Sequence, residues 1–144
     1  AVASAAGYIV DGQTTDAPII GVLNGIFYNA ATTLKPTFAN FYTQVTPANS
    51  EDIDAFVFDS PTQQYVVATD DAVTQAGFLE TYDMNTSAGS DITGKSSATL
   101  DIGDTSADAA TFRLLRVAED PENEDITAAR CSVVVVPNLI ELQS

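Results

Sequence analysis

The chain has 144 residues, with twenty Asp or Glu against five Lys or Arg, and a formal net charge of −15 at pH 7. It contains no histidine and one cysteine, which excludes histidine-activated nucleophiles, histidine-ligated zinc and an internal disulfide. The scarcity of cations argues against nucleic acid and anionic membranes as partners.

The length and composition predict one folded domain. Hydrophobic residues make up 45% of the chain, which is ordinary for a globular protein that folds without metal or disulfide. We divide it into an N-terminal arm, 1–17, whose one apolar patch is Tyr8, Ile9 and Val10, and a β domain, 18–144. Short runs of threonine, valine and aromatic residues between turn-formers predict a mainly β fold. We expect a small β-barrel or β-sandwich of about six to eight strands, with the arm extended.

The first predicted strands occupy the segment before residue 46. Residues 18–29 are expected to form one long strand or two short ones, interrupted at Gly21 and Gly25 as at a bulge. A second strand is predicted over 37–45. A turn-rich segment with one helical turn is expected over 46–52.

The clearest local pattern is a pair of apolar runs around an Asp-Ser-Pro turn. The runs are 53–58 and 64–68, and their arrangement predicts a β-hairpin. A further strand is expected over 75–82. A long surface loop over 85–97 and a short strand over 98–102 follow.

The last third predicts two strands joined by an acidic turn. The strands are 111–117 and 129–136, and the turn is 119–125. Four consecutive valines in the second strand indicate that both of its faces are covered. Cys131 stands just before this apolar run, which favours a small buried residue over a reactive thiol.

Few residue patterns indicate chemistry. The acidic turn at 119–125 lacks EF-hand spacing, so a solvated turn is favoured over a Ca²⁺ site. Asp91 and Asp104 each begin a partial match to the acid loops of aspartic proteases, and neither match is complete. We therefore predict no enzyme, no catalytic residue, no metal ligand and no cofactor. Arg113 and Arg116 are three residues apart and do not share a face of a regular strand, so one of them is left available to a partner.

Several segments together resemble a family of small structural proteins in tailed bacteriophages of marine bacteria and cyanobacteria. These proteins are read as capsid decoration, or cement, proteins. The similar segments are a glycine-spaced strand (21–28), a central pair of runs (52–61 and 65–67), a strand with an Asp/Pro/Asn turn (112–123) and a closing strand (131–136). The order of these segments covers the chain from Pro18 onward. The acidic turn departs from the commoner version in the family, which carries an arginine and fewer acids.

The resemblance implies a virion protein made in the cytoplasm of the host bacterium and placed on the exterior of the capsid. It would bind the outer surface of the expanded head and stabilise it. Its partners would be the major capsid protein and neighbouring copies of itself, in a trimer as the first expectation and a dimer as the second. We take Tyr8, Ile9, Val10 and Arg116 as the candidate capsid-contact residues.

Two other classes of function stay open at this point. The chain could be another virion part, such as a head fibre base or a tail component. It could also be a soluble β domain that binds a ligand or glycan. A hydrolase with a pair of acids is the least favoured alternative.

Overall fold

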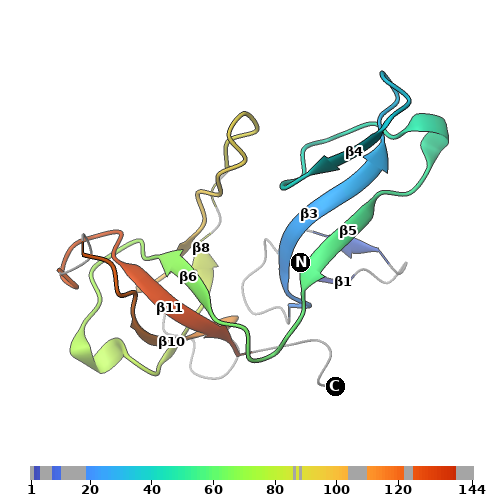
Figure 1. Cartoon of the computed structure of the whole chain (residues 1–144). Helices are drawn as coiled ribbons and strands as arrows, with labels where there is room; N and C mark the ends of the chain where they lie inside the picture. The colour runs from blue at the N-terminus through green and yellow to red at the C-terminus, as the bar shows by residue number, and fades with distance from the viewer. Residues whose placement is uncertain are drawn as a thin grey trace.

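The computed structural model describes residues 2–3, 8–10, 19–85, 87, 89–103, 110–121 and 125–138. In this part of the chain there are eleven strands, five of them two residues long, and two short 3-10 turns. The strands form several antiparallel sheets (Figure 1). The predicted mainly β fold is confirmed. No closed barrel is formed by the described strands, and the sandwich arrangement stays a prediction.

The larger sheet has four strands in the order β6-β11-β10-β7. Their bounds are Tyr65–Ala68 for β6, Thr81–Tyr82 for β7, Phe112–Val117 for β10 and Ser132–Pro137 for β11. The return strand β11 pairs antiparallel with both β10 and β6, as a central strand. Val133 and Val135 are fully buried and Val134 is 5% exposed. The prediction of a strand covered on both faces is therefore confirmed.

The main hydrophobic core lies against this sheet. A two-stranded sheet of β8 (Met84–Asn85) and β9 (Thr99–Leu100) contributes the fully buried Leu100. The Tyr65 and Phe112 rings meet edge to face, with centroids 6.2 Å apart. Cys131 is buried and free, as predicted. The buried residues of the core are Ile19, Val73, Tyr82, Leu100, Phe112, Leu114, Cys131, Val133 and Val135.

The second sheet has three strands in the order β4-β3-β5 and lies apart from the four-stranded sheet (Figure 1). Its strands are β3 (Val22–Asn29), β4 (Pro36–Ala39) and β5 (Asp54–Phe58). The register between β3 and β5 shifts between Leu23 and Gly25, which is the bulge that the glycine spacing predicted.

A short hairpin-like pair stands near the N-terminus. It consists of β1 (Val2–Ala3) and β2 (Ile9–Val10), which pair antiparallel. Tyr8 is also described, and the remainder of the predicted arm, 1–17, lies outside the described residues. The described part of the arm is therefore partly strand.

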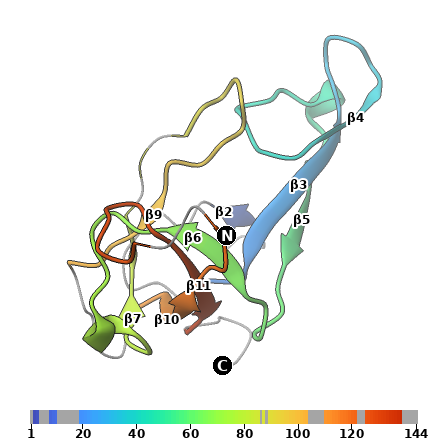
Figure 2. The same ribbon diagram turned by 60° about the vertical axis from the view of Figure 1, so that its left-hand side comes forward.

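The predicted hairpin between 53–58 and 64–68 is wrong. Both runs form strands, yet β5 pairs with β3 and β6 pairs with β11. The turn forms locally, since Gln63 N donates to Ser60 O at 3.1 Å. The chain then crosses from one sheet to the other (Figure 2), and Tyr65 Oη donates to Phe58 O across the crossing. Pairing with the buried valine strand covers more apolar surface than a two-stranded hairpin, which is marginal in water.

Two predicted strands were also too long. The 37–45 strand ends at Ala39, because the chain bends away at Asn40 and Phe41. In the 75–82 segment, Gln75–Gly77 form a 3-10 turn, residues 78–79 continue as a turn, and only Thr81–Tyr82 is a strand. Leu79 has a φ of +70°, a conformation that a strand does not allow. At 46–52 the structure has a short 3-10 turn, Ala48–Ser50, in which Asn49 and Ser50 have φ values of +56°, so it is not the regular helical turn that was predicted.

A substitution at Gly21, just before β3, tests how closely β3 and β5 approach each other. A Cβ at Gly21 would lie 1.9 Å from the Phe58 carbonyl oxygen, so the backbone itself must move. We expect Gly21→Ala to lower the free energy of unfolding by about 2–3 kcal/mol in urea titrations. Gly103→Ala is the matched control, because its Cβ meets only Asp101 Oδ1 at 3.5 Å, and we expect a change within about 0.5 kcal/mol. Equal effects of the two substitutions would contradict the described packing.

The titration of Tyr82 is expected to lower the stability of the folded protein at alkaline pH. Burial, and then the charge of Glu80, raise the pKa of Tyr82 above its ordinary value of 10.0. The folded state thus holds the phenolic proton more tightly than the unfolded state. Its contribution to stability is fully present below pH 10 and is lost as the pH rises through the folded pKa.

Tyr82→Phe removes this titration and the hydrogen bond from Tyr82 Oη to Gly77 O at 3.0 Å. We expect urea unfolding at pH 8 to show a loss of about 1 kcal/mol, and a shallower decline in stability as the pH rises through the ordinary tyrosine pKa and beyond it. Part of the decline remains, because burial and the Asp59 charge also raise the pKa of Tyr65. The exposed Tyr42→Phe is the control and leaves the profile unchanged.

Candidate functional site

One face of the three-stranded sheet is covered with exposed apolar side chains. The register pairs Val22 with Phe58, Gly25 with Phe56, and Phe27 with Phe38, so these positions share one face. We call the set the phenylalanine face, and its members are Val22, Phe27, Phe38, Phe56 and Phe58.

The exposure of this face is large. The exposed fractions of the four aromatic residues are 37% for Phe27, 58% for Phe38, 47% for Phe56 and 50% for Phe58. At about 200 Å² for each fully exposed aromatic side chain, they present roughly 400 Å² of apolar surface to solvent. A contiguous patch of this size on a monomer is often a site of interaction.

Local sequence explains how the face is organised. Phe56 and Phe58 alternate with smaller residues along β5, so both rings point to the same side. Gly25 leaves room for the Phe38 ring, whose Cζ would lie 2.6 Å from a Cβ at that position. The rings of Phe38 and Phe56 then lie 6.1 Å apart and are tilted by 46°.

The opposite face of the same sheet lines a cleft of about 870 Å³. Leu23, Ile26 and Ala55 form its floor, and Phe41 packs against Gly94 of the loop between β8 and β9 at one side. The other lining residues include Tyr8, Ile9, Asn40, Tyr42, Glu51 and Asp52.

The cleft combines aromatic rings with carboxylates and contains no Lys or Arg among its lining residues. Tyr8 Oη donates to Asp52 Oδ1 at 3.3 Å, and Asn29 Nδ2 donates to Glu51 Oε2 at 3.0 Å. These bonds join the N-terminal segment and β3 to the segment after the Ala48–Ser50 turn. The chemistry suits neutral polar or cationic groups, since carboxylates and ring faces both attract cations.

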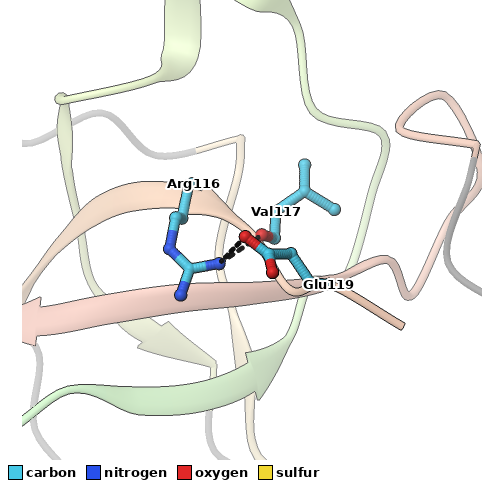
Figure 3. Close-up of polar contacts among 3 residues, drawn as sticks. All are labelled: Arg116, Val117 and Glu119. Carbon is cyan, nitrogen blue, oxygen red and sulfur yellow. Dashed lines mark hydrogen bonds and ion pairs between the residues drawn. The ribbon is translucent and has the colours of Figure 1, made fainter.

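The structure separates the sequence-predicted contact residues. Tyr8 and Ile9 line the cleft, and Val10 lies beside Ile9 in β2, where its backbone pairs with Val2. Arg116 lies on β10 of the other sheet. Its Nη1 contacts Glu119 Oε1 at 3.3 Å and donates to the Val117 carbonyl at 3.4 Å (Figure 3). These four residues therefore do not form one surface.

The prediction that Arg113 and Arg116 lie on different faces is wrong. Arg113 pairs with Val136 and Arg116 pairs with Val134, two residues apart on β11, so both arginines lie on the same face. The register shift between Leu114 and Arg116 inserts Leu115 as an extra residue and restores the alternation. Two residues that are three positions apart on a strand lie on the same face only when such a bulge lies between them.

A buried carboxylate serves the fold. Asp83 is 2% exposed, and its Oδ1 accepts from Thr111 N at 3.0 Å and Thr111 Oγ1 at 3.1 Å. This pair fastens the segment between β7 and β8 to the beginning of β10. Asp83 Oδ2 and Thr69 Oγ1 are buried without a hydrogen-bond partner among the described residues.

Within the described residues, no group of three or more His, Cys, Asp or Glu is arranged to hold a metal ion. Asp91 is exposed in a turn, and Asp104 lies outside the described residues. The pKa of Asp125 is lowered by hydrogen bonds from the Thr127 side chain and backbone, which is the chemistry of a turn. No helix in the described part of the chain is long and apolar enough to cross a membrane.

Sequence reasoning did not identify the phenylalanine face. The alternation of Phe56 and Phe58 was visible, but Ala55 and Val57 between them are apolar as well, so neither side of the strand stood out. The predicted hairpin also gave β5 the wrong neighbour. Comparisons with protein-family models, with curated proteins and with solved structures found no match.

Arg116 offers a test of whether its ion pair is structural. The side chains of Arg116 and Glu119 are 52% and 90% exposed, so solvent screens their attraction. We expect Arg116→Ala to change the free energy of unfolding by less than about 0.5 kcal/mol in urea titrations. Glu119→Gln is the matched variant with the same expectation. A larger loss in either variant would show that the pair supports the β10 end.

Proposed function

We propose that this chain is a bacteriophage capsid decoration protein, which binds the outer surface of the expanded head and stabilises it. The proposal rests on two supports of different kinds. One is the resemblance of the ordered strand segments to that family. The other is the phenylalanine face, an exposed aromatic surface of the kind that proteins use to bind other proteins.

The phenylalanine face carries the proposal, because it is the feature of the described residues that calls most directly for a protein partner. Exposed phenylalanines lower solubility unless they are covered in the working assembly. The net charge of −15 keeps free copies dispersed until they bind. This combination supports a binding role.

The proposal includes the location and the partners. The protein is made in the host cytoplasm and acts on the exterior of the capsid, with the major capsid protein and its own copies as partners. Nucleic acid and membrane have no part in it. The sandwich arrangement of the β domain belongs to the same proposal. Repeated weak contacts with the shell and with neighbouring copies give avidity without one strong site.

Co-sedimentation with expanded phage heads stripped of accessory proteins tests this function. We expect saturable binding, in a fixed ratio to the major capsid protein and at about hundreds of copies per particle. Phe38→Ser combined with Phe56→Ser should reduce the bound copies by at least about ten-fold, and Ile92→Ser, at a position 93% exposed and outside the phenylalanine face, should not.

Wild-type protein that fails to bind expanded shells would contradict the proposal. Binding at only a few copies per particle would instead assign the chain to a head fibre base or a tail component. Quantitative mass spectrometry of the pelleted particles distinguishes these results.

The cleft supports a second candidate function, a β domain that binds a small ligand or glycan. Its volume of about 870 Å³ and its aromatic lining are suited to a sugar or an amine. A glycan array and a thermal-shift screen test this candidate. A hit that is lost in Tyr42→Ala and retained in Tyr28→Ala would favour it, since Tyr28 lies outside the cleft lining.

A further inference from the structure

One face of the three-stranded sheet has no covering layer among the described residues. Ile26 is the one apolar side chain in β3, β4 and β5 that is buried, whereas the four-stranded sheet supplies most of the buried core. A sheet with an apolar face is stable when a second layer covers that face. The N-terminal segment and the segment around Phe41 line the opposite face, so the phenylalanine face is the one that no described segment covers.

The phenylalanine face carries too little negative charge to select a basic partner. The three strands, which are described in full, contain one carboxylate, Asp54, at the beginning of β5. The register pairs Asp54 with Phe27, so this carboxylate lies at one end of the phenylalanine face, and the rest of the face carries no charge although the whole chain has twenty carboxylates. Charge depletion with aromatic enrichment is the composition of the buried centre of a protein–protein interface. An apolar, nearly neutral face is complementary to another face of the same kind.

The area of the face fits a dimer. A standard interface buries about 800 Å² on each partner, with an apolar centre and a polar rim. The roughly 400 Å² of exposed phenylalanine surface is about the size of such a centre. Asn24 and Asp54 in the same strands are polar and exposed and would form part of the rim.

We propose that the phenylalanine face is covered by the same face of a second copy of this chain, in a two-fold dimer. Two three-stranded sheets then pack about 10 Å apart, and their phenylalanine rings interdigitate. An interface that uses one patch on both copies is closed by a two-fold axis, which favours a dimer over the trimer expected from the resemblance. The clefts of both copies remain outside this interface.

This inference deepens the proposed function by assigning the contact between copies. The inference rests on the proposed function only for its biological setting, because dimer formation is measured in the absence of capsids. Failure to bind heads with an intact dimer would overturn the decoration role alone. Failure to dimerise with intact head binding would overturn the inference alone.

Sedimentation equilibrium of the full chain from about 1 to 200 µM, in about 50 mM and 500 mM NaCl, tests the dimer. We expect a dimer whose association tightens with salt, because each copy carries a charge of −15 and the copies repel each other. A contact with a basic partner would weaken with salt. Wild-type protein that is monomeric at the highest concentration in both salts would overturn the proposal, as would a trimer.

The variant Phe38→Ser with Phe56→Ser locates the interface. We expect the dimer dissociation constant to rise at least about 100-fold, because four rings are removed from each dimer. Ile92→Ser and Val66→Ser are the controls, since both residues are exposed and lie outside the face, and they should leave the constant unchanged. A dimer that persists in the double variant would overturn the assignment of the face.

Circular dichroism verifies that the double variant is folded. If it is not, Phe38→Leu with Phe56→Leu keeps an apolar side chain at each position, and a rise of about 10-fold is expected. If residues outside the described part of the chain, or an unrelated protein, cover the phenylalanine face, the wild-type protein will be monomeric. That result would contradict the dimer.

Discussion

The pairing of β11 with two strands at once organises most of this structure. Val133, Val134 and Val135 are buried along β11, the central strand that β10 and β6 flank, and Val133 and Val135 belong to the main hydrophobic core. Burying three valines contributes several kcal/mol of hydrophobic free energy, on the order of 1.5–3 kcal/mol each. That gain draws β6 away from its neighbour in sequence, β5, and leaves β5 to pair with β3 alone. The two sheets therefore differ in kind, since one contains the core and the other does not.

The absence of a buried core beside the three-stranded sheet has consequences for function. A sheet with one uncovered face becomes more stable when a partner binds to that face, because the free energy of binding adds to the stability of the folded state. Its phenylalanine rings are rigid, apolar and presented in register by a bulged strand. Apart from Asp54 at one end of the face, the strands of this sheet carry no acidic group, and Glu51 and Asp52 lie in the cleft behind the sheet. A sheet that offers an apolar face on one side and an acidic cleft on the other is able to contact two different partners.

The proposed decoration role uses both sides of that sheet. Under it, pairing of copies through the phenylalanine face leaves the cleft, with Tyr8 and Ile9, directed away from the dimer interface. The N-terminal contact residues would then reach the shell while the copies hold each other. Arg116 lies on the other sheet and is paired with Glu119, so it has no evident part in this arrangement.

The sequence by itself determined the mainly β class, the bulge near Gly25, the burial of the valine strand and Cys131, and the β10–β11 pair, because strand propensity and alternation are local and adjacent strands pair readily. It also excluded histidine chemistry through composition alone. The tertiary structure decided which strands pair at long range, and it separated β5 from β6. It placed Arg113 and Arg116 on one face through a bulge that no residue pattern announces. The phenylalanine face likewise exists only because of the register among three strands. Exposure depends on what packs against a side chain, and no local pattern contains that information.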